Sequence, residues 1–252
     1  MPGRKVTVSM VSRSMGSRPT LISLCLTFVA HAQALSPAKS FFQWFKSSEA
    51  VAALHQKHVE GDTVVHMLKD TPFAAAPDSL KLDFARGPAG EAVAEFMRLE
   101  QQYIGDWKLD RIVEAAGADF DPVAARASLV SKASSTPVVL FSFVDCPWCL
   151  LAKEALQSQM QLAGVIDALL IIELEDERRE GKRLRAAIAR ATGRTSMPSI
   201  FVGGRAIGGY TDGEPQGDED LCLSGSPGLQ QLVESGEFQM LLQSACSVLE
   251  RR

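Results

Sequence analysis

The sequence predicts an α/β domain over its second half, preceded by a mainly helical extension, and two observations predict this arrangement. Runs of β-branched and aromatic residues, which are typical of buried strands, recur after residue 137. Segments with apolar residues at helical spacing alternate with those runs, whereas only helical spacing occurs between residues 93 and 116. The elements of the second half therefore follow the order βαβα and then ββα.

Boundary residues help to define the individual elements. Gly203-Gly204 predicts a hairpin turn, and Asp121-Pro122 predicts a helix start because proline suits the first helical turn. Asp106 is expected to cap a helix that ends at Gly117, and the prolines and glycines of residues 71–90 argue against one regular element there. Strands are expected at 138–144, 168–172, 199–202 and 205–207, with a helix after each of the first two strands and helices over 229–249.

Composition places the chain among ordinary globular proteins. It has 252 residues, 46% of them hydrophobic and 22% charged, and a net charge of −4. This composition excludes a wholly disordered chain, and the acidic balance argues against a general nucleic-acid binder. Five cysteines are too few for a disulfide-dense scaffold, and the length allows one or two domains.

The first 48 residues differ from the rest in charge. They contain six Lys and Arg but no acid, which leaves 20 basic against 30 acidic residues downstream. The apolar run 21–30, which includes Cys25, is too short to span a membrane and precedes small-x-small sequences typical of signal cleavage. Residues 35–48 are basic and Ser-rich, as in transit peptides. We expect residues 1–48 to be a plastid-targeting presequence; a secretory lumen, a mitochondrion or no targeting at all remain alternatives.

A Cys-x-x-Cys motif directly follows the first expected strand and opens a helix. Its residues are Cys146-Pro147-Trp148-Cys149, and this context predicts thioredoxin-like redox chemistry. Free N–H groups at a helix N-terminus stabilise a thiolate, which favours Cys146 as the nucleophile. A zinc site would need a second ligand pair, but no His follows position 66. An inert buried cysteine pair is the other weak alternative.

Two further motifs resemble those of glutaredoxins. Ser196-Met197-Pro198 and Gly208-Gly209-Tyr210-Thr211-Asp212 correspond to that family's T-V-P and G-G-C-x-D, and Cys-Pro-Trp-Cys corresponds to C-P-Y-C. The resemblance covers about residues 121–250. It implies a thioredoxin-like (glutaredoxin) fold, in which helices flank a four-stranded mixed sheet. We therefore expect a glutaredoxin domain at 121–252, after an extension of unknown function at 49–120.

The resemblance implies a glutathione-dependent thiol-disulfide oxidoreductase that reduces glutathione mixed disulfides and protein disulfides. Cys146 would attack the disulfide, and Cys149 would resolve mixed disulfides with proteins. Pro198 would be cis, Met197 would present its backbone to glutathione, and Asp212 would face the γ-glutamyl ammonium. The expected glutathione-binding residues are Pro147, Trp148, Ser196, Met197, Pro198, Gly208, Gly209, Thr211 and Asp212. We expect a monomer with glutathionylated or disulfide-bonded proteins as partners, glutathione as co-substrate, and no metal, nucleic acid or, in the mature form, membrane.

Three departures from the family pattern affect these expectations. Phe143 stands where the family usually has a lysine that would bind the glycyl carboxylate of glutathione. Arg194 either compensates for that loss or is a solvated surface residue. Met197 replaces the usual valine. An acidic loop, 213–227, is longer than usual and carries Cys222, which is either regulatory or an incidental loop cysteine.

Other features leave alternatives open. A thioredoxin or disulfide-isomerase-like protein would share the two cysteines and the proline, although the G-G-x-x-D element favours glutathione. An iron-sulfur carrier would bridge a cluster between two chains through Cys146, which Pro147 disfavours by analogy with the family. We expect Cys246 to lie in the core, His55 and His58 to lie on a solvated helix face, and the aromatic run 41–45 to belong to the presequence.

Overall fold

The computed structural model describes residues 75–175, 178–213, 217–249 and 251. The expected presequence at 1–48, the aromatic run within it, Cys25, and the pair His55 and His58 all lie outside these described residues. None of the helices in the described part is long and apolar enough to span a membrane.

A four-stranded mixed sheet forms the centre of the fold, as predicted. Its strands are β1 (Val138–Ser142), β2 (Leu169–Glu173), β3 (Ser199–Val202) and β4 (Arg205–Gly208), in the spatial order β2-β1-β3-β4. The pair β1 and β2 is parallel, whereas β1 with β3 and β3 with β4 are antiparallel. Gly203 and Gly204 both have positive φ angles, 59° and 83°, and form the predicted hairpin turn between β3 and β4.

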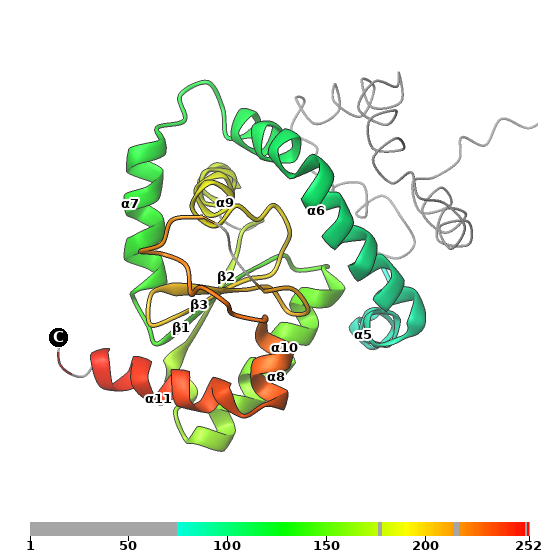
Figure 1. The fold of residues 1–252 in the computed structure, drawn as a ribbon, viewed down its shortest axis with the longest axis vertical. Helices are drawn as coiled ribbons and strands as arrows, with labels where there is room; N and C mark the ends of the chain where they lie inside the picture. Colours follow the sequence, from blue (N-terminus) through cyan, green and yellow to red (C-terminus); the bar gives the residue numbers. More distant parts are fainter. Residues whose placement is uncertain (1–74, 176–177, 214–216, 250, 252) are drawn as a thin grey trace, which may run out of the picture. The chain divides into compact units, whose positions relative to one another are not determined.

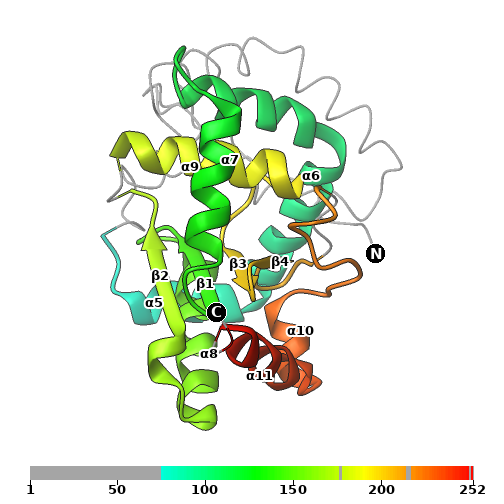
Figure 2. The ribbon, with the colours of Figure 1, turned by 90° about the vertical axis from the view of Figure 1, so that its left-hand side faces the viewer.

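Helices cover both faces of this sheet. Helices α7 (Pro122–Ala133) and α9 (Arg178–Thr192) lie on one face, and α8 (Pro147–Ala163), α10 (Leu229–Glu234) and α11 (Glu237–Leu249) lie on the other (Figures 1 and 2). The side chains of β1 alternate between the two cores, although all five of its residues are buried. This continuous burial explains why β1 is read from the sequence as an uninterrupted apolar run.

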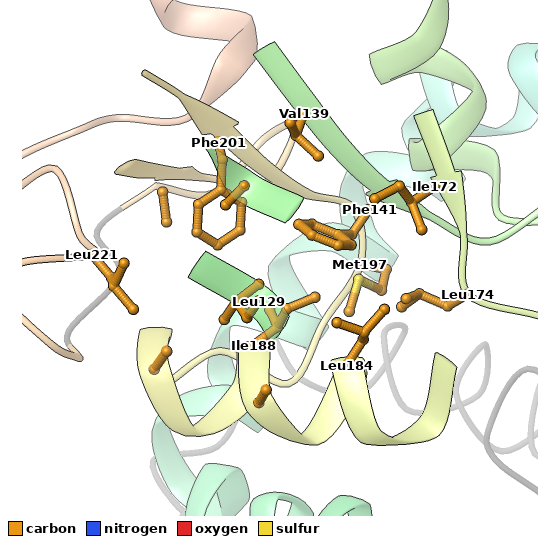
Figure 3. Close-up of a cluster of buried hydrophobic side chains, with 14 of the residues drawn as sticks. Leu129, Val139, Phe141, Ile172, Leu174, Leu184, Ile188, Met197, Phe201 and Leu221 are labelled. Carbon is orange, nitrogen blue, oxygen red and sulfur yellow. The ribbon is translucent and has the colours of Figure 1, made fainter. Parts of the chain in front are cut away.

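The core on the α7 and α9 face packs around two phenylalanines (Figure 3). Phe141 of β1 and Phe201 of β3 meet edge to face, with 5.5 Å between ring centroids. Leu129 of α7 and Ile188 of α9, both fully buried, complete the cluster beneath them. The side chain of Asp121 accepts hydrogen bonds from the first turn of α7, and Pro122 is its first residue, which confirms the predicted start of this helix.

The described part of the extension is helical, as predicted, but its division differs from the expectation. Helix α5 covers Asp78–Arg86, and α6 runs without a break from Pro88 to Ala115, so the expected helix start at Asp106 is wrong. The break lies instead at Gly87 and Pro88, and Gly117, with a φ of 102°, follows the end of α6 as expected. Packing holds the middle of α6 helical, because tertiary contacts override weak local signals. Figure 1 shows α6 running from the side of α9 to α5, which lies beside α8.

The segment after β4 is more structured than an acidic solvated loop. The backbone of Ala206 in β4 accepts from the N–H of Leu223 at 2.9 Å and donates to the carbonyl of Leu221 at 2.7 Å. Leu221 and Cys222 are buried as a result, so Cys222 is not an exposed loop cysteine. Asp218 pairs with Arg126 of α7, and Leu221 packs in the core on the α7 and α9 face, so the described part of this segment is held to that face.

Candidate active site

The two motif cysteines lie at the junction between β1 and α8. Cys146 is the residue that caps α8, and Pro147 occupies the first turn, where its missing N–H leaves no acceptor unpaired. Cys146 is partly exposed, and its Sγ lies 3.9 Å from the backbone oxygen of Met197. Cys149 is buried, and its Sγ accepts a weak hydrogen bond from the N–H of Phe143 at 3.5 Å. The accessible thiol is therefore Cys146, and Cys149 lies one turn behind it.

The surroundings shift the pKa values of the two thiols in opposite directions. A hydrogen bond from the Cys149 side chain lowers the pKa of Cys146, aided by backbone N–H groups of the first turn of α8 and by the charge of Lys153. Burial raises the pKa of Cys149 well above its usual range, and the neighbouring Cys146 adds to this. Of the two thiols, Cys146 is therefore the one that ionises first as pH rises.

A small pocket lies beside Cys146. The Met197–Pro198 peptide bond on one wall is cis, as the resemblance implied. The cavity measures about 20 Å³, and an open hollow of about 200 Å³ shares Thr211 with it and continues along α10. Its lining residues are Ala94, Met97, Trp148, Ser196, Met197, Pro198, Tyr210, Thr211 and Asp212. The structure therefore brings six of the expected binding residues together around one pocket and adds Tyr210 and two residues of α6.

Gly208 and Gly209 shape the pocket without lining it. Gly208 has a φ of 105°, and the N–H of Gly209 donates to the backbone oxygen of Asp212 at 2.7 Å, which closes a tight turn. A Cβ on Gly209 would lie 2.3 Å from Oδ1 of Asp212 and 2.5 Å from a guanidinium nitrogen of Arg194. Asp212 and Arg194 therefore leave no space for a side chain at position 209, whether or not a ligand is bound.

Arg194 is buried, so the interpretation as a solvated surface residue is wrong. Its side chain is 6% exposed, and its Nη1 donates to Oδ2 of Asp212 at 2.8 Å. Nη1 also donates to the backbone oxygen of Asp212 at 3.1 Å, and Nη2 donates to the hydroxyl of Ser196 at 3.1 Å. Arg194 thus joins the loop before β3 to the loop after β4, which are the two walls of the pocket.

Arg185 is a candidate site residue that the sequence reasoning missed. Its guanidinium carbon lies 5.3 Å from the centre of the Phe143 ring, in a cation–π contact. Phe143 is the position at which the family usually has a lysine. Burial lowers the pKa of Arg185 to about 10, so it remains a cation at neutral pH. Within the described part of the chain no carboxylate pairs with it, and its buried Nε has no hydrogen-bond partner. A buried cation without a counter-charge beside the motif is suited to binding an anion.

The remaining cysteines lie away from the motif. Burial raises the pKa of Cys222, whose Sγ donates to the backbone oxygen of Ala191, so this thiol is a poor nucleophile. Cys246 packs at the edge of the core formed by α8, α10 and α11, as predicted. The described residues contain no group of three His, Cys, Asp or Glu side chains that could hold a metal ion.

Comparison with known proteins points to one family. The Glutaredoxin family model matches residues 138–207. Over 88 residues the chain is 35% identical to Glutaredoxin-C6 of Oryza sativa subsp. japonica, covering 35% of this chain and 72% of that protein. It is 38% identical to Glutaredoxin-C2 of Arabidopsis thaliana over 76 residues, 30% of this chain and 62% of that one. Glutaredoxin-C4, chloroplastic, of Oryza sativa subsp. japonica is 36% identical over 91 residues, 36% of this chain and 63% of that relative. The matched part of this chain spans less than two thirds of the length of the last two relatives.

Proposed function

This chain belongs to the glutaredoxin family of glutathione-dependent oxidoreductases, and on that premise we propose that it reduces glutathione mixed disulfides and protein disulfides through a Cys146/Cys149 dithiol. The observation that carries the proposal is the asymmetry of the two cysteines. Cys146 is partly exposed with a lowered pKa, whereas Cys149 is buried with a raised one. Such a pair suits a nucleophile followed by a resolving thiol, because only the thiolate attacks a disulfide.

On a glutathione mixed disulfide the first sulfur alone performs the exchange. The Cys146 thiolate attacks the glutathione sulfur, a Cys146–glutathione disulfide forms, and the substrate protein leaves as a thiolate that takes a proton from water. A second glutathione thiolate then attacks the bound glutathione sulfur. This step releases oxidised glutathione and restores the Cys146 thiolate, so the enzyme is unchanged and glutathione supplies the two electrons that reduce the substrate.

On a protein disulfide the second cysteine is required. Attack by Cys146 gives a mixed disulfide with the substrate, and Cys149 then loses its proton and attacks Sγ of Cys146. The substrate leaves fully reduced, and Cys146 and Cys149 form a disulfide. Two glutathione molecules reduce this disulfide and become oxidised glutathione.

The pocket supplies groups that fit the parts of glutathione. The backbone of Met197 faces Cys146 and suits strand-like pairing with the cysteinyl part. Thr211 and the carboxylate of Asp212 suit the γ-glutamyl end, where Arg194 already holds Asp212 in place. Outside the lining of the pocket, the buried Arg185 over Phe143 suits the glycyl carboxylate as the cation that replaces the missing family lysine.

A glutathione-coupled assay with two substrates tests the dithiol route. Cys146→Ser is expected to abolish reduction of both substrates, because the other thiol of the motif, Cys149, is buried with a raised pKa. Cys149→Ser is expected to lose reduction of protein disulfides but keep reduction of glutathione mixed disulfides. Cys222→Ser is the matched control, because this thiol is buried away from the motif. Activity that survives in Cys146→Ser would show that the proposed nucleophile is wrong.

We further propose that the protein works in a plastid. The acid-free segment 1–48 supports this location, and one relative is named chloroplastic. A fusion of residues 1–60 to a fluorescent protein should enter plastids. Signal in the secretory lumen or in mitochondria would favour one of the alternatives, and a diffuse cytosolic signal would contradict targeting altogether.

A further inference from the structure

The helical segment that precedes the domain reaches the redox motif through α5. Lys81, whose side chain is only 3% exposed, donates to a carboxylate oxygen of Asp145 at 2.7 Å, directly before Cys146. Phe84 meets the ring of Trp148 edge to face, with 6.2 Å between the ring centroids. Both contacts join α5 to the residues that surround the nucleophile.

Gln101 of α6 makes a third contact, on the opposite wall of the pocket. Its Oε1 accepts from the N–H of Thr195 at 3.1 Å and from the Thr195 hydroxyl at 2.6 Å, and its Nε2 donates to the carbonyl of Gly193 at 2.8 Å. Thr195 belongs to the segment that leads into the cis peptide bond. One turn later Gly105 leaves space for this side chain, because a Cβ there would lie 2.5 Å from Nε2 of Gln101. Gln101 thus uses both ends of its carboxamide at this contact.

Between these contacts, α6 covers the pocket. Ala94 and Met97 form its outer wall and face Trp148, Pro198 and Tyr210. The cavity that they leave is about 20 Å³, which is space for about one water molecule. Pockets that hold small organic ligands measure about 300–1,000 Å³. Even together with the adjoining open hollow of about 200 Å³, the pocket in this conformation is therefore smaller than such pockets.

We propose that α5 and the first half of α6, residues 78–101, form a cap that closes the pocket in the free protein and moves away before a glutathionylated substrate binds. This inference rests on the proposed function, because it takes the pocket to be the glutathione site. If the capped form predominates, the apparent affinity equals the intrinsic affinity multiplied by the open fraction. Weakening one cap contact then tightens substrate binding without changing the groups that perform the exchange.

The variant Gln101→Ala tests this prediction in the full chain. It removes three hydrogen bonds of the cap and is expected to lower the KM for a glutathione mixed disulfide about threefold to tenfold, with kcat unchanged. Gln102→Ala is the matched control, because Gln102 is the next residue of the same helix and is exposed. An unchanged KM in Gln101→Ala would overturn the cap, as would a raised KM, which would make α6 a binding wall. Failure of the proposed function gives a different pattern, in which parent and variants all lack activity on the mixed disulfide.

Hydrogen exchange provides a second measurement that does not depend on a cap variant. In Cys149→Ser, the Cys146 thiolate attacks oxidised glutathione, releases one glutathione and keeps the other as a mixed disulfide. This loading is expected to speed amide exchange in residues 78–101 and to leave exchange in α11 unchanged. Unchanged or slower exchange in residues 78–101 after loading would overturn the cap, whereas failure to load at all would contradict the proposed nucleophile.

Discussion

Replacing Arg194 with methionine should destabilise the fold strongly, because this side chain holds the two walls of the pocket together. Methionine keeps much of the length and the apolar stem but removes the charge and every donor. The charge-assisted bond to Asp212 is lost, together with bonds to the Asp212 backbone oxygen and the Ser196 hydroxyl. The carboxylate of Asp212 is then left without its counter-charge.

The size of the loss follows from the burial of the pair. Arg194 is 6% exposed and Asp212 is 28% exposed. Removing one partner of a buried ion pair costs about 3–5 kcal/mol, and we take the lower end because water reaches Asp212. A loss of about 3 kcal/mol corresponds to a fall in Tm of about 6–12 °C for a domain of this size.

Urea unfolding and calorimetry of the full chain measure both quantities. Arg98→Met is the matched control, because Arg98 also pairs with a carboxylate but is 55% exposed, and it should cost less than about 1 kcal/mol. A double-mutant cycle with Asp212→Asn should give a coupling energy of about 2 kcal/mol. If Arg194→Met unfolds within about 2 °C of the parent, the pair does not hold the two walls together and the reasoning is wrong.

Two further predictions concern the site itself. Because only the thiolate reacts, alkylation of Cys146 should be fast above its lowered pKa and should slow as pH falls through that pKa. Cys149→Ala removes the hydrogen bond that lowers this pKa most, so the midpoint of the rate–pH curve should move to higher pH. An unchanged midpoint would exclude that hydrogen bond as the cause. Arg185→Gln should raise the KM for a glutathione mixed disulfide about tenfold or more, with little change in kcat. Arg190 is exposed on the same helix, so Arg190→Gln should leave KM unchanged. Equal KM values in the two variants would exclude Arg185 from the glycyl site.

The features that sequence reasoning recovered are those set by local chemistry. Asp121 followed by proline starts α7, Gly203-Gly204 turns the hairpin, and Cys146 caps α8 after a buried strand. Each of these depends on groups within a few residues of one another, so the pattern is readable along the chain. The continuous apolar run of β1 is read correctly for a related reason, since both faces of that strand are covered.

The features that it missed depend on contacts between distant segments. Arg194 is an ordinary polar residue by sequence and is buried only because Asp212, eighteen positions later, folds back onto it beside Gly209. Arg185 follows the apolar Leu184 in an Arg-rich helix, where arginine usually extends into water. Its burial follows from the packing around α9, which has α7 on one side and α6 on the other. No pattern within 178–192 predicts this packing.

The same packing determines how a cap could move. The second half of α6 is fixed to the domain, because Ile112 and the following Ala116 pack with Ala186 and Ala189 of α9. The first half of α6 contacts the rest of the domain through the hydrogen bonds of Gln101 and through Ala94 and Met97 at the pocket, and most of its residues are partly exposed. Gly105 lies between the halves, where glycine lowers helix stability by about 1 kcal/mol relative to alanine. Opening therefore requires bending near Gly105 and not undocking of the whole helix, so amide exchange should increase before Gly105 while the contact with α9 stays protected.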